Sequence, residues 1–229
     1  MTVTPATGKG RFITFEGGEG TGKLTQIKAL AARLDEAGQR TLVTREPGGS
    51  PGAEIIRHLV LSGVGKALGP DCEALLFAAA RDDHVHQVIA PALDEGVWVL
   101  CDRFIDSTRV YQGRIGSVDR GLIRALERAT IGTLLPDLTL VLDLPAETGM
   151  ARAALRRGAG QADRFEAEDI DFHRRLRDAY RQIAIDEPQR CVLIDADGPE
   201  AEVAARIWQI VAGRFADPVP HGALEVSHA

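Results

Sequence analysis

The chain is short of cysteine, of long apolar runs and of surplus positive charge. Its three cysteines, Cys72, Cys101 and Cys191, form no CxxC pair. We therefore expect small buried thiols and not a metal or redox site. No stretch approaches the roughly 18 continuous apolar residues that a membrane-spanning helix needs. The polar segment 1–11 lacks the apolar core of a signal peptide. These absences predict a cytoplasmic protein with no membrane partner.

The formal net charge of the chain is −6. A general nucleic-acid binder usually carries a basic surplus, so we expect no nucleic-acid polymer as a partner. Any phosphate must then be held by local clusters of arginine, lysine and backbone N–H groups. The length of 229 residues, 45% of them hydrophobic, fits one α/β domain over 1–229. We expect the terminal segments 1–10 and 217–229 to be loosely ordered.

Short apolar runs alternate with longer amphipathic segments along the chain. The runs are apolar almost throughout, as expected for parallel strands buried on both faces: 12–15, 41–44, 97–101, 138–144 and 191–194. The first helical segment begins at Lys23 and ends before Gly38, which supplies a stop signal. Further helical segments are expected at 71–87, 119–129, 146–157, 169–186 and 200–215. Pro91 should kink or divide the helical region before the third strand. This alternation predicts an α/β fold with a doubly wound, five-stranded parallel sheet, whose ligands lie beyond the carboxyl ends of the strands.

A glycine-rich loop follows the first expected strand, and a helix follows the loop at once. Its sequence EGGEGTGK at 16–23 contains the Walker A spacing G-x4-G-K, and the strand and helix supply the right context. Glycines let successive N–H groups turn inward on a phosphate, and the lysine reaches the β- and γ-phosphates. We predict a P-loop that binds ATP through Gly17, Gly18, Glu19, Gly20, Thr21, Gly22, Lys23, Leu24 and Thr25.

One position of this loop departs from the Walker A pattern. Leu24 stands where the pattern has Ser or Thr, whose hydroxyl binds Mg²⁺. Thr25 comes next, but one residue along a helix points roughly 100° away. Three explanations stay open: water and carboxylates hold the metal instead, the change weakens catalysis, or the chain binds nucleotide without turnover. We favour weakened but surviving activity, because Lys23 and the glycines are present.

Four further segments after the glycine-rich loop contain recognisable motifs. They are TREPGG at 44–49, LFAAAR at 76–81, DRF with ST and YQG within 102–113, and DRFE at 163–166. Together with the loop they resemble the thymidylate kinase family, in its bacterial type with a lid-borne arginine, and the resemblance covers about 11–215. It implies transfer of the γ-phosphate of ATP to dTMP, giving dTDP and ADP for dTTP synthesis. It also implies a nucleoside monophosphate kinase-like fold with a lid at about 151–165, Mg²⁺ as the cofactor, and a homodimer packed through helices beside the acceptor site.

The resemblance places the acceptor phosphate and sugar at the ends of the second and third strands. Arg45 and Arg103 would contact the phosphate, and Glu19 would lie near the sugar. Tyr111 would pack against the sugar and disfavour a 2′-hydroxyl. Asp102 resembles the Walker B position, which holds Mg²⁺ directly or through water. A charged pair that closes a buried strand could also be only a solvated strand end, which is the less favoured alternative.

The resemblance also assigns residues that read the acceptor base. Phe77 and Arg81 are four residues apart and therefore share one helix face. Phe77 would stack on the pyrimidine, and Arg81 would contact the polar edge of that base. Thr108 and Gln112 would read the thymine edge by hydrogen bonds. Without the resemblance, Phe77 would be a core residue and Arg81 a surface charge.

The segment 151–164 carries four arginines and two glycines. A helix of this kind that runs into a glycine-containing loop suits a lid over the donor phosphates, although a solvated amphipathic helix has the same pattern. Gly20 occupies the loop position where some members of the family carry a basic residue, so the resemblance assigns the catalytic arginine to the lid. The catalytic candidates are Lys23, Asp102, Arg152, Arg156 and Arg157, with Arg164 as a further lid candidate.

Two other functions stay open. Another nucleoside monophosphate kinase, for adenylate, guanylate or cytidylate, would have the same fold and loop, and only the base-reading residues argue against it. A nucleotide-binding regulatory protein without kinase activity would explain Leu24. The arginines for a second phosphate argue against that function, because a sensor of ATP alone needs no acceptor site.

Overall fold

A five-stranded parallel sheet forms the centre of the computed structural model, which describes residues 10–62, 68–158, 160 and 164–215. The strands are β1 (Phe12–Glu16), β2 (Thr41–Arg45), β3 (Trp98–Asp102), β4 (Leu138–Asp143) and β5 (Cys191–Asp195), in the order β2-β3-β1-β4-β5. The predicted doubly wound sheet is confirmed, and each strand end lies within one residue of its expected position. The predictions for 1–9 and 217–229, and for positions 159 and 161–163 of the expected lid, concern residues outside those described.

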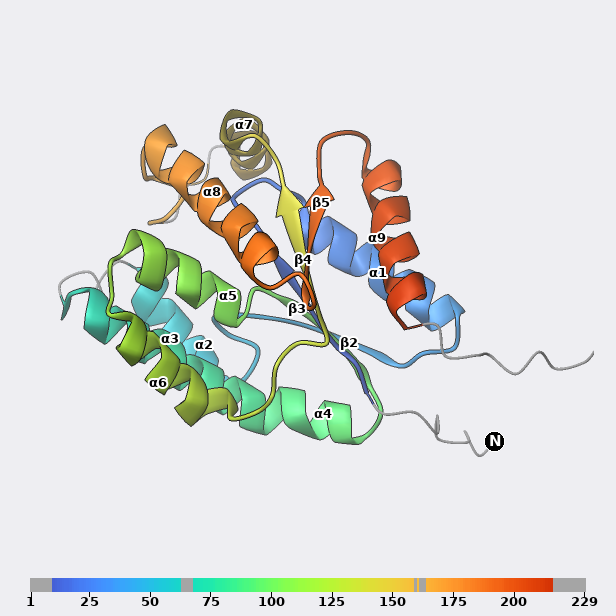
Figure 1. Ribbon diagram of the computed structural model, residues 1–229, viewed down its shortest axis with the longest axis horizontal. Helices are drawn as coiled ribbons and strands as arrows, with labels where there is room; N and C mark the ends of the chain where they lie inside the picture. The colour runs from blue at the N-terminus through green and yellow to red at the C-terminus, as the bar shows by residue number, and fades with distance from the viewer. Residues whose placement is uncertain (1–9, 63–67, 159, 161–163, 216–229) are drawn as a thin grey trace, which may run out of the picture.

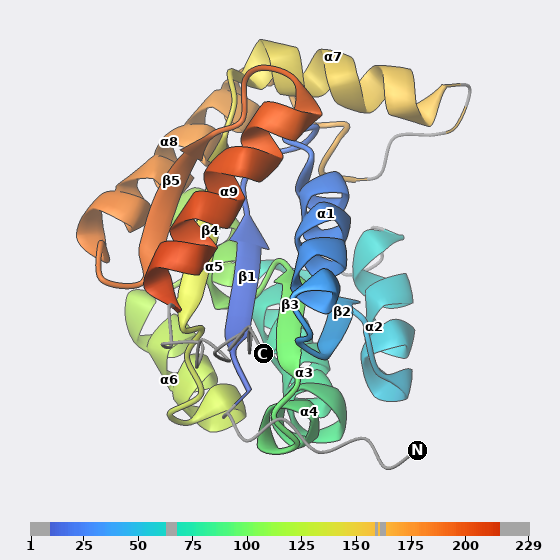
Figure 2. The ribbon, with the colours of Figure 1, turned by 90° about the vertical axis from the view of Figure 1, so that its right-hand side faces the viewer.

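Helices cover both faces of this sheet (Figure 1). They are α1 (Lys23–Glu36), α2 (Pro51–Leu61), α3 (Pro70–His84), α4 (Ala90–Asp94), α5 (Ile105–Thr108), α6 (Arg120–Ile131), α7 (Ala146–Arg157), α8 (Ile170–Asp186) and α9 (Glu200–Arg214), with π-helical turns η2 (Val85–Ile89) and η3 (Arg109–Ile115). Helices α1 and α9 lie together on one face, and α3, α4, α5, α6 and α8 lie on the other (Figure 1). Helix α7 lies across the carboxyl end of the sheet (Figure 2). No helix within the described residues is long and apolar enough to cross a membrane.

Strand β1 is buried along its whole length and alternates between two cores. Ile13 and Phe15 pack with Ile27 of α1 in the core between the sheet and helices α1 and α9. Phe12 points to the other face, where its ring meets Phe104 edge-on with centroids 4.8 Å apart. Because both faces of the strand are covered, the glycine-rich loop leaves the sheet from a rigid base.

The structure contains one long helix that the sequence analysis does not predict. Helix α2 begins with Pro51 in its first turn, after Ser50, and ends at Leu61. Proline is favoured at the first helical position, because the missing N–H has no partner there in any case. Its apolar residues Ile55 and Leu59 are exposed.

The helical region before β3 is divided where Pro91 predicts, and the division takes the form of a π-helical turn. Helix α3 ends at His84, η2 follows over Val85–Ile89, and Pro91 lies in the first turn of α4. A π-turn accommodates proline, whose ring clashes with a carbonyl of the preceding turn and which donates no hydrogen bond. The expectation of buried thiols is correct for Cys101 and Cys191 and wrong for Cys72, which is exposed on α3.

Candidate active site

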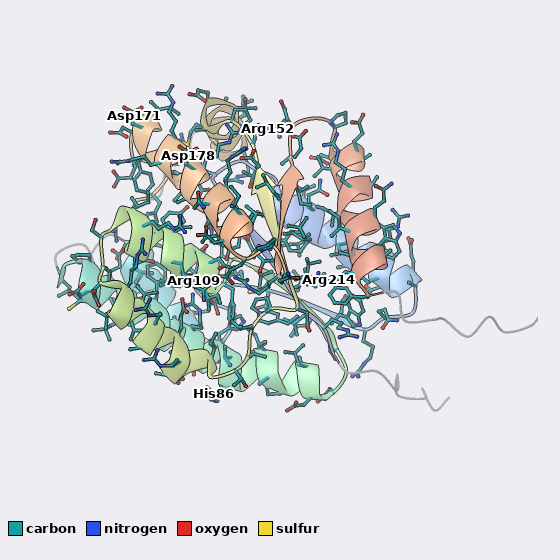
Figure 3. All side chains as sticks on the ribbon, in the orientation of Figure 1. His86, Arg109, Arg152, Asp171, Asp178 and Arg214 are labelled. Atoms are coloured by element: carbon teal, nitrogen blue, oxygen red, sulfur yellow. The ribbon has the colours of Figure 1, made fainter. Side chains whose placement is uncertain are left out.

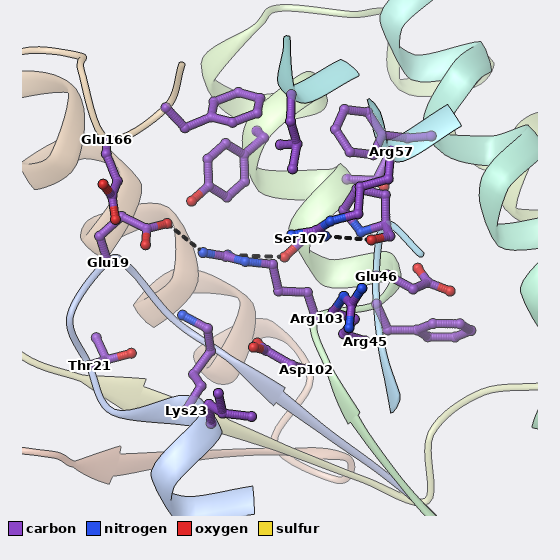
Figure 4. A pocket seen from close by; sticks show the side chains of 18 of the residues that line it. Glu19, Thr21, Lys23, Arg45, Glu46, Arg57, Asp102, Arg103, Ser107 and Glu166 are labelled. Carbon is purple, nitrogen blue, oxygen red and sulfur yellow. Dashed lines mark hydrogen bonds and ion pairs between the residues drawn. The ribbon is translucent and has the colours of Figure 1, made fainter. Parts of the chain in front are cut away.

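A cavity of about 380 Å³ opens beyond the carboxyl ends of β1, β2 and β3 (Figure 4). The carboxyl edge of the sheet is where ligands are expected to bind in an open parallel sheet. Most of the residues selected from the sequence line this cavity: Glu19, Gly20, Thr21, Gly22, Lys23, Leu24, Thr25, Arg45, Phe77, Arg81, Asp102, Arg103, Thr108, Tyr111, Gln112 and Arg156. Gly17 and Gly18 lie behind the loop instead, and Arg152 and Arg157 are not among the lining residues.

The glycine-rich loop holds its lysine against its own backbone. The Nζ of Lys23 donates to the carbonyl oxygens of Gly17 and Gly18, at 3.1 and 2.9 Å. Burial, assisted by the positive charge of Arg103, lowers the pKa of the Lys23 ammonium. The loop therefore presents a buried cation at the start of helix α1, where backbone N–H groups add positive potential.

Gly20 has no room for a side chain. Its φ is +67°, and a Cβ built there would lie 1.9 Å from the carbonyl oxygen of Gly149 on helix α7. Gly149 is equally restricted, because its own Cβ would lie 2.4 Å from the carbonyl oxygen of Glu19. The loop and the first half of α7 thus pack backbone to backbone. A basic side chain at position 20 is excluded, so a cation for the donor phosphates must come from another element.

The metal-binding capacity of the site rests on Asp102, at the end of β3. Its Oδ1 is buried and has no hydrogen-bond partner among the described residues. An unpartnered carboxylate oxygen fits Mg²⁺, which is commonly held by one or two carboxylates, waters and substrate phosphates. Leu24 also faces the cavity, with 53% of the residue exposed, but it offers no oxygen ligand. The described residues contain no group of three or more His, Cys, Asp or Glu side chains that could hold a metal by themselves.

Arg103 lies across the centre of the cavity in a strained backbone conformation, with φ 69°. Its Nη2 donates to Glu19 Oε1 at 2.7 Å, and its Nη1 donates to Ser107 Oγ at 3.4 Å (Figure 4). Its Nη1 also donates to the Tyr180 hydroxyl at 3.1 Å. Burial raises the pKa of Glu19, but the charges of Arg103 and Lys23 outweigh it, so the pKa is lowered overall. Two cations and one carboxylate therefore meet where a phosphate and a sugar could lie.

Glu16 ends β1 and anchors the segment that carries Arg103. Its Oε1 accepts from the backbone N–H groups of Phe104 and Ser107, at 2.8 and 3.2 Å. Its Oε2 accepts from the Ser107 hydroxyl at 2.7 Å. Burial, reinforced by the negative charge of Asp106, raises the pKa of this carboxyl group from 4.5 to about 7. The start of α5 is thus fixed to the strand that supports the loop.

Arg81 is a buried part of the cavity wall and not a surface charge. Its Nε donates to Glu46 Oε2 at 2.8 Å, and its Nη2 donates to Thr108 Oγ1 at 2.9 Å and to the Phe104 carbonyl at 3.1 Å. His84 is fully buried behind it, with Nδ1 3.2 Å from the other oxygen of Glu46. A guanidinium held by several fixed partners is well placed to offer a remaining N–H group to a ligand.

Helix α7 brings its arginines to the carboxyl end of the sheet. Arg156 lines the cavity, and both Arg156 and Arg157 bind the carboxylate of Glu166, at 3.1 and 2.9 Å. Arg152 points away, toward the loop after β5 (Figure 3), where it donates to the carbonyl of Ala196 at 3.3 Å. Of the helical lid arginines, only Arg156 reaches the same cavity as Lys23.

Several lining residues escape the sequence analysis. Arg57 and Leu61 come from helix α2, and Arg57 donates to the Pro47 carbonyl at 2.6 Å. The helix-start signal of Ser50 and Pro51 would have revealed this helix. Glu166 belongs to the DRFE segment of the sequence analysis but receives no role there, because its partners Arg156 and Arg157 lie on α7.

A P-loop beside a second, arginine-lined compartment defines the class of this protein. Both features lie at the carboxyl end of a five-stranded parallel sheet, with an arginine-bearing helix across the loop. This is the arrangement of P-loop kinases of the nucleoside monophosphate type.

Comparison with known proteins narrows the class to a family. A family model described as thymidylate kinase matches residues 15–207. A thymidylate kinase of Bradyrhizobium diazoefficiens is 66% identical over 224 residues, which cover 98% of each chain. Those of Nitrobacter winogradskyi and Nitrobacter hamburgensis are 71% and 68% identical over 87% and 90% of each chain. The chain belongs to the thymidylate kinase family.

Proposed function

We propose that this protein is a dTMP kinase, which transfers the γ-phosphate of ATP to dTMP and releases dTDP and ADP. The observation that carries the proposal is the single cavity lined both by the P-loop lysine and by Arg81, Arg103 and Thr108. A second compartment with cations and hydrogen-bonding side chains suits a nucleoside monophosphate. The names of the relatives support thymidylate as that acceptor.

The chain's own side chains account for binding and alignment. Phosphoryl transfer needs donor and acceptor oxygens in line, compensation of the charge on the moving group, and exclusion of water. Lys23 and the loop N–H groups would hold the β- and γ-phosphates, and Arg45 and Arg103 would hold the acceptor phosphate. The acceptor oxygen is already an anion, so no general base is required. Mg²⁺ at Asp102 would supply charge compensation on the donor phosphates when bound.

Arg156 is the lid residue that we assign to the transferring phosphate. Arginines in this role contribute about 10³–10⁵ in rate in related systems. We expect Arg156→Ala to lower kcat by at least about 10³-fold, with a smaller effect on the binding of dTMP. Arg152→Ala, on the same helix but bonded away from the cavity, is the control. Equal kcat values for Arg156→Ala and the wild type would remove Arg156 from the mechanism.

Leu24 weakens this activity without abolishing it. The residue faces the cavity but cannot bind a metal, whereas Asp102 keeps a free oxygen. We expect Leu24→Ser to raise kcat and to lower the Mg²⁺ concentration needed for half-maximal rate. Leu135→Ser, at another exposed leucine, is the control. An unchanged rate and unchanged Mg²⁺ dependence in Leu24→Ser would show that the leucine has no such cost.

The deciding experiment is a coupled assay of ADP release with ATP and Mg²⁺, in which dTMP, dUMP, dCMP, AMP and GMP are offered separately. Turnover that is selective for dTMP supports the proposal. Turnover with another monophosphate would identify a different nucleoside monophosphate kinase. No turnover by either the wild type or Leu24→Ser would favour the second candidate, a nucleotide-binding protein without kinase activity, which the apolar residue in the loop makes worth testing.

A homodimer and a cytoplasmic location stay predictions. Exposed apolar residues on two adjacent helices support a dimer: Ile55 and Leu59 on α2 and Leu75 on α3. Sedimentation equilibrium should give twice the chain mass of 24.6 kDa. The double variant Ile55→Glu, Leu59→Glu should then sediment as a monomer, whereas Leu135→Glu should not.

A further inference from the structure

Glu73, on helix α3, is a buried carboxylate that does not line the cavity. Only 8% of its side chain is exposed, and each of its oxygens has its own partner. Oε1 accepts from the side-chain Nε2 of Gln112 at 2.9 Å, and Oε2 forms an ion pair with Arg164. Gln112 lines the cavity, so the carboxylate lies directly behind a residue that would face the acceptor base.

The chemistry of the partners determines how the amide of Gln112 is turned. A carboxylate beside a guanidinium accepts hydrogen bonds and donates none, so the amide nitrogen must face Glu73. The opposite orientation would place the amide oxygen against the carboxylate, with two acceptors in contact. Among the described residues, the Oε1 of Gln112 has no hydrogen-bond partner, so it is left as an acceptor for a ligand in the cavity.

The second partner ties this arrangement to the segment after α7. Arg164 is 16% exposed in its side chain, and its guanidinium lies 4.7 Å over the ring of Phe165. Phe165 lines the cavity and packs edge-on against Tyr111, with centroids 5.1 Å apart. The lid side and the acceptor side of the cavity are therefore connected through one carboxylate.

We propose that Glu73 is a specificity-determining positioning residue, which locks Gln112 as an acceptor and thereby selects pyrimidines that carry a hydrogen on N3. The inference rests on the proposed function. Thymine and uracil donate from N3–H, and the Oε1 of Gln112 accepts from such a donor. Cytosine has a lone pair at N3, so it would meet an acceptor that cannot turn. Glu73 thus acts against the wrong base without touching either base.

The inference is tested by replacing Glu73 with its neutral isostere. In Glu73→Gln the new amide either donates or accepts, so Gln112 turns to suit the base that is present. We expect the ratio of the dCMP to the dTMP dissociation constant to fall by about tenfold or more. In the variant, bound dCMP gains one hydrogen bond where two acceptors opposed each other, and a hydrogen bond changes affinity by about that factor. The constants are measured by calorimetry without ATP, so that Leu24 does not enter the result. Asp71→Asn, at an exposed acid on the same helix, should leave the ratio unchanged.

The outcomes separate this inference from a structural role. If Glu73→Gln weakens both nucleotides equally, Glu73 only supports the fold and the inference is wrong. If that variant does not fold, Glu73→Met, which keeps the volume but removes the acceptors, should show the same loss of selectivity, and an unchanged ratio would again overturn the inference. Wild-type protein that binds no dTMP would overturn the proposed function itself and this inference with it. Tight binding of dTMP with an unchanged ratio in the variants would overturn only the inference.

Discussion

The buried carboxyl group of Glu16 should make the stability of this protein fall as the pH rises through neutrality. Glu16 is fully buried at the end of β1. Burial and the negative charge of Asp106 raise the pKa of its carboxyl group from 4.5 to about 7. The folded protein therefore binds this proton more tightly than the unfolded chain does. The resulting stabilisation is complete below pH 4.5 and is lost as the pH rises through about 7.

The size of the effect follows from the two pKa values. At about 1.4 kcal/mol per pKa unit, the whole change is worth about 3 kcal/mol. Between about pH 6 and pH 8 the folded protein releases most of this proton, whereas the unfolded chain holds almost none at either pH. The free energy of unfolding should then fall by about 1.4 kcal/mol from this group alone over that interval.

Glu16→Gln removes the titration and keeps an oxygen for the N–H groups of Phe104 and Ser107. Urea unfolding of the wild type and the variant should be measured at pH 6, 7 and 8, and the difference between them taken at each pH. That difference cancels the histidines and should move by about 1.4 kcal/mol in favour of the variant from pH 6 to pH 8. Glu147→Gln, at an exposed carboxyl whose pKa is lowered, should show no such movement. A difference that stays constant over the same interval would refute the reasoning.

Two other contacts give predictions of their own. Gly20→Ala should weaken ATP binding about 5- to 150-fold in a titration, because the loop must withdraw from α7 at a cost of about 1–3 kcal/mol. Gly213→Ala, on helix α9 where a Cβ meets nothing within 4 Å, should bind ATP normally, and equal affinities for the two variants would contradict the argument. Asp106 is fully buried and holds Arg190 through two hydrogen bonds of 2.7 and 2.9 Å. Asp106→Ala removes the buried carboxylate and leaves Arg190 paired only with the more exposed Glu187, at 2.8 Å. The free energy of unfolding should fall by about 3 kcal/mol in urea, whereas the exposed Asp186→Asn should change it by less than about 1 kcal/mol.

The loop and its strand were predictable because their signals are local. Glycine spacing, Lys23 and the flanking apolar runs occupy one short stretch, and parallel strands impose their own apolar pattern. Asp102 and Arg103 could be selected for the same reason, since they directly follow a buried strand whose carboxyl end must face the ligand. The strands and the cavity edge were therefore available from the sequence, and so were most of the lining residues.

Helix α2 is absent from the sequence analysis, because its start signal at Ser50 and Pro51 directly follows Pro47, Gly48 and Gly49, which favour a turn. Arg57, which lines the cavity from this helix, was missed with it.

The sequence by itself determined the sheet, the phosphate loop and the family motifs, because each depends on residues that are neighbours along the chain. Only the tertiary structure decided how the motifs support one another. The sequence pattern alone predicts that Arg81 is a surface charge. In the structure Arg81 is buried, because the fold places Glu46 beside it. Gly20 has no space for a side chain because Gly149 of α7 packs against it, and Gln112 is oriented because α3 places Glu73 behind it. Such contacts join residues far apart in the chain, and their geometry follows from strand order and helix packing, which no local pattern contains.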